Sequence, residues 1–189
     1  MAVATTGRCR SRAHLRGEPG DNFGLALAAV SVLDVNIEPA LRSTSSTAFQ
    51  REVLELLPEF WPGRDVRSLH HSAWFRQFAD AAMTARTEDG ALRGYLLACV
   101  TRRLGYVHLI ATHPRARRQG VARSMYDAFF TLADDEGCTV TEAVTTPPNR
   151  ASIAFHERLG FTATLVSDYA GPGEDRVHFV RRVPGHADA

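Results

Sequence analysis

The sequence has few of the features that mark membrane, disulfide-rich or metal-binding proteins. No apolar run approaches the roughly 18 residues of a membrane-spanning helix. Its three cysteines, Cys9, Cys99 and Cys138, are odd in number and widely spaced, so neither a disulfide framework nor a CxxC metal pair is expected. Cys99 and Cys138 lie in apolar, strand-like runs, which predicts small buried side chains. A reducing, cytoplasmic location fits this pattern.

Neither positive nor negative charge predominates in the sequence. Twenty-two basic and 21 acidic side chains give a net charge of +1, so no overall field favours nucleic acid. The 189 residues suit one domain with a substantial core. We expect that domain at 35–184 and a short tail at 185–189. Residues 1–34 form an N-terminal extension: 1–22 lack a secretory apolar core and are interpreted as a flexible arm, with an organellar presequence as the alternative, and the apolar run 23–33 shows no clear periodicity and is left unassigned.

Hydrophobic periodicity predicts an α/β or α+β domain with a mixed sheet. A strand, two helices and a hairpin come first, and one crossover helix follows the fourth strand. Pro39 should confine the first strand to an edge or end it. The expected elements are strands in 35–43, 106–112, 138–145, 161–169 and 176–183, a hairpin over 82–103, and helices over 47–60 (capped by Ser45 or Ser46), 66–82, 121–136 and 150–159 (capped by Asn149).

The stretch RARRQGVARSMYDAFF, residues 115–130, places four arginines at the start of a helix, three before it and Arg123 in its first turn. A helix N-terminus already carries a partial positive charge, so the arginines are unfavourable there unless an anion binds. Gly120 allows a ligand to approach the backbone closely, and the first helical amides converge on one point. The turn matches neither GxxxxGK[ST] nor GxGxxG. We interpret it as a phosphate or pyrophosphate site, with a solvated basic turn as the alternative.

This turn is the first of two sequence motifs that together resemble a known family. The first has the form R/Q-x-x-G-x-G/A and reads RRQGVA, residues 117–122. The second has the form N-x-x-S/A-x-x-F-x-x-x-x-G-F and reads NRASIAFHERLGF, residues 149–161. With both motifs, residues 85–165 resemble the GNAT superfamily of acyl-CoA N-acyltransferases. The resemblance implies a three-layer sandwich around a mostly antiparallel sheet, in which the parallel fourth and fifth strands splay apart.

The resemblance also implies a binding site for acetyl-CoA and no metal. The turn would hold the pyrophosphate, and the end of the fourth strand would pair with pantetheine and point an N–H at the thioester oxygen. The second motif would contact the pantetheine arm. The implied residues are Arg117, Arg118, Gln119, Gly120, Val121, Ala122 and Arg123 in the turn, Ile110, Ala111 and Thr112 on the strand, and Asn149, Ser152 and Phe155 in the second motif.

Three side chains are candidates for moving protons. The family commonly has a tyrosine acid where this chain has His156, which leaves His156 as a proton donor or only a binding residue. His108 should share a strand face with Tyr106 and Ile110, and YVHLIATH resembles the fourth strand of arylalkylamine N-acetyltransferases, where histidines relay protons. A packed strand histidine is the alternative. Glu142 is unusual on an otherwise apolar strand and is the other candidate base.

These observations predict an N-acetyltransferase that moves an acetyl group from acetyl-CoA to a primary amine, in a small molecule, by direct attack in a ternary complex. The absence of a plausible cysteine nucleophile favours direct attack. The alternatives are an acyl-CoA-binding module with little turnover and a GNAT-fold transferase that uses an aminoacyl-tRNA donor. Neither a membrane nor nucleic acid is expected as a partner, whereas the family often forms homodimers.

Overall fold

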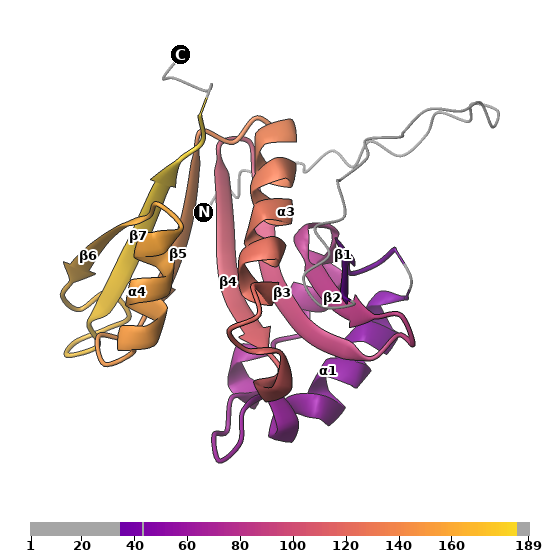
Figure 1. The fold of residues 1–189 in the computed structure, drawn as a ribbon. Coiled ribbons are helices and arrows are strands. Elements are labelled where there is room, and N and C mark those ends of the chain that lie inside the picture. Colours follow the sequence, from indigo (N-terminus) through magenta and orange to yellow (C-terminus); the bar gives the residue numbers. More distant parts are fainter. Residues whose placement is uncertain (1–34, 43, 185–189) are drawn as a thin grey trace, which may run out of the picture.

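The computed structural model describes residues 35–42 and 44–184, which form one seven-stranded sheet with helices on both faces (Figure 1). The strand order is β1-β2-β3-β4-β5-β7-β6. Neighbouring strands are antiparallel except β4 and β5, which are parallel. The predicted α/β fold with a mixed sheet is therefore confirmed. The arm at 1–34 and the tail at 185–189 lie outside the described residues.

The elements occur in the predicted order, and their bounds lie close to the predicted ones except for the second helix. The strands are β1 Val35–Pro39, β2 Met83–Thr87, β3 Leu92–Val100, β4 Leu104–Thr112, β5 Val140–Thr145, β6 Thr162–Val166 and β7 Arg176–Arg182. The longer helices are α1 Ser46–Phe60, α3 Val121–Asp135 and α4 Arg150–Arg158. Among the described residues, no helix is both long and apolar enough to cross a membrane.

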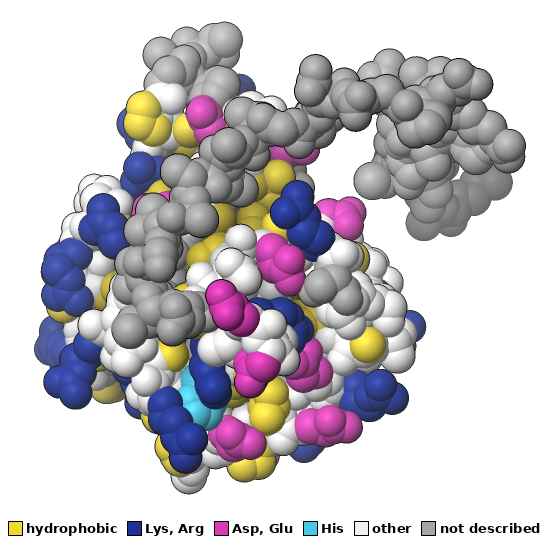
Figure 2. All heavy atoms as spheres, turned by 45° about the vertical axis from the view of Figure 1, so that its right-hand side comes forward, with side chains coloured by type: hydrophobic (Ala, Val, Ile, Leu, Met, Phe, Trp, Pro, Cys, Tyr) yellow, Lys and Arg dark blue, Asp and Glu magenta, His cyan; other side chains and the backbone are white. Residues whose placement is uncertain are grey.

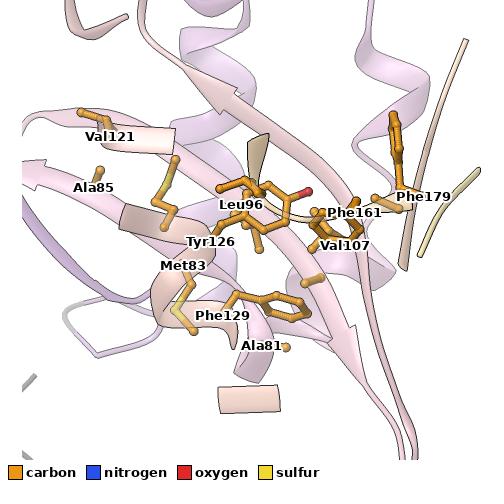
Figure 3. Packing of buried hydrophobic residues seen from close by; sticks show 14 of the residues in the cluster. Ala81, Met83, Ala85, Leu96, Val107, Val121, Tyr126, Phe129, Phe161 and Phe179 are labelled. Atoms are coloured by element: carbon orange, nitrogen blue, oxygen red, sulfur yellow. The ribbon is translucent and has the colours of Figure 1, made fainter. Parts of the chain in front are cut away.

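Each face of the sheet has its own apolar core. On one face α1 buries Phe49, Val53 and Leu57, spaced four residues apart, against β3 and β4. On the other face α3 buries Val121, Met125 and Phe129 with the same spacing, and α4 packs beside it. Figure 3 shows members of this second cluster. The helix periods read from the sequence thus identified correctly which face of each helix is buried, and the three layers implied by the resemblance are present.

Two local predictions at strand and helix ends are confirmed. Strand β1 is the edge strand of the sheet and ends at Pro39. The Ser45 side chain accepts a hydrogen bond from the Ala48 N–H at 3.3 Å and caps α1. Of the two candidate buried thiols, Cys138 is buried and Cys99 is only half-buried.

The prediction of a single helix over 66–82 is wrong. The segment instead forms two short 3₁₀ turns, Arg67–Leu69 and Ala79–Ala81, and one helical turn, α2 Ala73–Arg76. The break lies at His70, whose Nδ1 donates to the Val66 carbonyl at 2.8 Å and whose Nε2 lies 2.9 Å from the Tyr95 hydroxyl. These buried contacts with β3 outweigh the weak helical preference of the segment.

Candidate active site

Strands β4 and β5 separate halfway along their length, and both helices of one face begin at the open end. The parallel pairing joins Leu104–Val107 to Val140–Ala143 and then stops. On its other edge β4 stays paired with β3 as far as Thr112. Figure 1 shows the two ribbons diverging, with α3 over β4 and α4 over β5. The edge of β4 beyond Val107, which includes Ile110, Ala111 and Thr112, therefore has backbone groups without a strand partner.

A β-bulge at His108 marks the point where the strands separate. The register between β3 and β4 joins Leu97 to Leu109 and Ala98 to Val107, so His108 is the extra residue. A one-residue shift exchanges the faces of the sheet for every residue that follows. The local twist and the turned backbone groups of a bulge are common beside functional sites.

The bulge corrects one prediction about the faces of β4. Tyr106 and His108 do share a face, since both rings contact Trp74 of α2. Ile110, however, packs against the α3 side of the sheet, whereas Leu109 joins the α1 side. The prediction assumed the strict alternation of an unbroken strand, which puts Ile110 on the same face as His108. The sequence carries no signal of the extra residue that breaks this alternation.

The His108 ring is held in one orientation. It stacks on the Trp74 ring with centroids 4.2 Å apart and planes 7° apart, and its Nε2 donates to the Leu69 carbonyl at 2.8 Å. Because a carbonyl only accepts, Nε2 carries the hydrogen and the neutral ring keeps a lone pair on Nδ1. Nδ1 has no hydrogen-bond partner within 35–42 and 44–184. Burial lowers the pKa of His108 below its usual 6.5, so the ring is neutral at pH 7.

Glu142 lies on the same face as His108. It is in register with Tyr106 across the parallel pair, and its carboxylate accepts a hydrogen bond from His178 Nε2 of β7 at 3.0 Å. Burial raises the pKa of Tyr106 to about 12, and the nearby Tyr169 and Glu142 add to the effect. The face therefore joins Tyr106, Glu142, His178 and Tyr169 next to His108.

Exposed apolar side chains surround this face. Three of the four exposed large apolar side chains in the described residues, Leu69, Phe78 and Tyr169, belong to segments that contact it. Phe78 lies 5.2 Å from the Trp74 ring, and Tyr169 lies 6.1 Å from the His178 ring. An exposed apolar cluster beside ionisable groups is typical of a binding surface rather than of chance exposure.

The turn before α3 has the geometry expected of an anion site. Gly120 has φ 85° and Arg118 has φ 61°, so both adopt the left-handed conformation, which is strained for arginine. Unlike α1 and α4, helix α3 has no side-chain cap. The N–H groups of residues 120–123 have no acceptor among the residues that the structure describes. Such a helix end is suited to bind phosphate.

The arginine side chains of this turn make different contacts. The Arg117 guanidinium donates to the Thr112 carbonyl at 3.3 Å and to the Phe60 carbonyl at 3.2 Å, and so fastens the turn to β4 and α1. Arg118 and Arg123 are exposed, and Arg123 lies 3.7 Å from Asp127. Those two side chains can add charge-assisted bonds to an anion on the amides. Gln119 donates to a carbonyl within the turn.

The second motif lies at the start of α4, across the gap between the strands. Asn149 accepts a hydrogen bond from the Ser152 N–H at 3.3 Å, which confirms it as the cap of α4, and donates to the Thr145 hydroxyl at 3.0 Å. Phe155 is half-buried beside Tyr126, with ring centroids 5.7 Å apart. Both polar atoms of Asn149 thus already hold the first turn of α4 against the end of β5.

His156 is separated from the other two proton-transfer candidates by the sheet. It is buried on the α3–α4 side, stacked on Phe179 with ring centroids 4.1 Å apart. Its Nδ1 donates to the Ser152 carbonyl at 2.8 Å, and its Nε2 accepts from the Tyr126 hydroxyl at 2.7 Å. Sequence reasoning missed Tyr126, whose helical position predicts only a core residue. The structure places His108 and Glu142 on one face of the sheet and leaves His156 in the core on the other.

Other hollows of the surface do not involve these residues. One of about 510 Å³ runs along α1 and is lined by Gln50, Leu54 and Arg67, among others. A second of about 380 Å³ lies beside β1 and β2, at Asn36 and Arg86. Figure 2 shows this side of the molecule, where basic and acidic side chains lie next to one another. Within the described residues no group of three His, Cys, Asp or Glu side chains is placed to hold a metal.

Residues 47–161, more than half of the chain, match the model of the acetyltransferase (GNAT) family. The chain belongs to the GNAT acetyltransferase family. The family span contains the bulge in β4, the turn before α3 and the cap of α4. The protein is thus an acetyl-CoA-dependent acyltransferase, and the resemblance seen in its two motifs is confirmed.

Relatives of this GNAT acetyltransferase include aminoglycoside acetyltransferases. The aminoglycoside N(6')-acetyltransferase type 1 of Serratia marcescens is 30% identical over 120 residues, which are 64% of this chain and 75% of the relative. The yncA protein of Salmonella typhimurium, solved with acetyl-CoA, is 20% identical and covers 83% of this chain and 98% of its own, with a TM-score of 0.61. An aminoglycoside 6'-N-acetyltransferase solved with coenzyme A is 12% identical, with a TM-score of 0.61, and covers 81% and 99%.

The buried pair formed by Tyr126 and His156 makes the stability of the acetyltransferase depend on pH. Burial lowers the pKa of His156 in the folded protein below 6.5, its value when exposed. The unfolded chain therefore binds more protons than the folded one as pH falls below about 6.5, and this part of the stability is lost below the folded pKa. We expect the melting temperature to fall between pH 7 and pH 5, and to fall less steeply in the double variant Tyr126→Phe/His156→Leu. An equal slope in both proteins would contradict this role.

Proposed function

We propose that this acetyltransferase transfers the acetyl group of acetyl-CoA to a primary amine of a small molecule, by direct attack in a ternary complex. One observation carries the proposal: the edge of β4 that has left β5 runs from His108, whose Nδ1 has no hydrogen-bond partner among the described residues, toward the turn before α3, a helix without a side-chain cap. The Serratia marcescens relative, an aminoglycoside N(6')-acetyltransferase, supports a small-molecule acceptor.

The chain's own groups fit the two ends of coenzyme A. The N–H groups of residues 120–123, with Arg118 and Arg123, suit the negative charge of its pyrophosphate. The unpaired edge at Ile110, Ala111 and Thr112 suits the amide groups of an extended pantetheine arm. Acetyl-CoA supplies an acetyl group already activated as a thioester. An N–H of this edge, fixed by the sheet, polarises the thioester oxygen without reorganising.

His108 prepares the nucleophile. An alkylamine with a pKa near ~10 is only about one-thousandth unprotonated at pH 7, so a base is needed. Nδ1 of His108 takes the proton of the ammonium group, and the resulting imidazolium keeps its Nε2–H on the Leu69 carbonyl. The Trp74 ring beneath it favours the positive charge. The thiolate of coenzyme A, with a pKa near ~8.5, leaves without a strong acid, so no step requires His156.

The test is release of free coenzyme A from acetyl-CoA with benzylamine, spermidine, kanamycin or a peptide with a free N-terminus. We expect amine-dependent release with at least one of the small amines and its acetylated product by mass spectrometry. The sequence contains no lysine, so no lysine side chain of the enzyme competes with the added amine as acceptor. Stabilisation by coenzyme A without release would instead favour a binding module. Salt-sensitive retention of tRNA would favour the aminoacyl-tRNA alternative.

A further inference from the structure

Glu142 and His178 form an isolated polar pair on the face that carries His108. We propose that this pair is the binding site for the ammonium group of the acceptor, with Glu142 as the ligand and His178 as a positioning residue. The inference rests on the proposed function, because it names how the same site recognises its amine. No part of the sequence analysis pointed to His178.

The strands hold the two side chains against each other. β5 and β7 are antiparallel, with Glu142 opposite Val180 and Val144 opposite His178, so the pair is a diagonal one on a single face. His178 Nε2 donates to Glu142 Oε2 at 3.0 Å, and the side chains are 24% and 28% exposed. A carboxylate that is mostly buried is rare without such a partner.

A continuous row of contacts joins this pair to the base. Tyr106 is in register with Glu142 on the neighbouring strand. Its ring lies 6.4 Å from the Trp74 ring, and Trp74 stacks on His108 at 4.2 Å. The carboxylate and Nδ1 of His108 therefore belong to one surface that crosses from β7 to β4 where the parallel strands begin to separate.

The chemistry of the surface suits an alkylammonium ion. Oε1 of Glu142 has no hydrogen-bond partner in the part of the chain that the structure describes, so it can accept from an N⁺–H. The rings of Tyr106 and Tyr169 flank the pair and favour a cation over a neutral ligand. The ammonium proton goes to His108, the free amine then attacks the thioester, and the second N–H proton is taken up by the departing coenzyme A thiolate. Removing His178 leaves the carboxylate free to turn toward water.

Kinetics of His178 variants separate positioning from a structural role. In His178→Ala the KM for the amine should rise about tenfold, while kcat changes less than about threefold and the KM for acetyl-CoA is unchanged. His178→Gln keeps an N–H donor and should recover most of the affinity. Glu142→Gln should match His178→Ala, and the double variant should be no worse than Glu142→Gln alone. Thr162→Ala, exposed on the edge strand β6, is the control and should behave as wild type.

The contrary results are equally specific. An unchanged amine KM in His178→Ala would overturn the inference. So would strictly additive effects in the double variant, or an equal loss of kcat with both substrates. A fall in melting temperature with unchanged amine KM would show a structural role only.

A binding measurement tests the site without turnover. Methylammonium chloride, which carries only the ammonium group, is added to the protein with coenzyme A while the imidazole signals of His178 are followed by ¹H–¹⁵N NMR. We expect a saturable shift with methylammonium, a much smaller one with tetramethylammonium, which has no N–H to donate, and none in Glu142→Gln. If the enzyme acetylates amines but methylammonium leaves His178 unchanged, this inference fails alone. If methylammonium binds but no amine is acetylated, the proposed function fails and the ammonium site stands.

Discussion

Replacing Gly120 by valine is expected to weaken coenzyme A binding at least 100-fold, about 2.8 kcal/mol at 1.4 kcal/mol per factor of ten. Gly120 adopts φ 85° directly before α3. A β-branched residue resists this conformation, and a change of backbone torsion there would turn the amides of residues 120–123 away from a common point. Isothermal titration with coenzyme A measures the effect.

The other end of the same helix provides the matched control. Gly137 follows α3 with φ 73°, and a Cβ atom there would meet nothing within 4 Å. Gly137→Val therefore imposes the same backbone strain, about 1–2 kcal/mol, far from the proposed site. The melting temperature should fall by a similar amount in both variants, whereas the affinity for coenzyme A should fall only in Gly120→Val. Equal affinity in the two variants would refute the role of the turn.

Replacing His108 by alanine is expected to lower the amine-dependent kcat about 100-fold, as loss of a general base does. Coenzyme A affinity should stay within about twofold, because the amides of α3 are unaffected. Burial lowers the pKa of His108, and only the neutral ring can take a proton. The wild-type rate should therefore fall as pH falls through that lowered pKa, and this acidic limb should be lost in His108→Ala.

An exposed histidine serves as the control for His108. His71 lies on the surface of the loop before α2, and His71→Ala should leave the rate and its acidic limb unchanged. A pH profile of His108→Ala with the same acidic limb as wild type would show that another group is the base. Initial rates from pH 5 to pH 8 with saturating acetyl-CoA decide between these outcomes.

The sequence predicted best those features whose causes are local. The positive φ of Gly120, the caps at Ser45 and Asn149, and the edge position of β1 with Pro39 follow from the chemistry of a few adjacent residues. The periodicity of α1 and α3 in turn fixed which side chains meet the sheet. The glycine turn and the hairpin over 82–103 could therefore be placed before any contact was known.

Features that depend on distant contacts were missed. The helix expected over 66–82 breaks because His70 bonds to Tyr95, 25 positions further along the chain. The bulge at His108 depends on how β3 and β4 align, which the strand pattern does not encode. His178 meets Glu142 only because β7 lies beside β5, 36 positions away. In each case the deciding interaction is tertiary, and local propensity is too weak to reveal it.

Backbone amide NMR with added coenzyme A tests the central claim most directly. If the start of α3 holds the pyrophosphate, the N–H signals of residues 118–123 should shift most, and pantetheine, which lacks that group, should leave them nearly unchanged. Pantetheine should still shift the edge of β4 at Ile110, Ala111 and Thr112. Unshifted signals at 118–123, with the largest changes along α1 instead, would contradict the account.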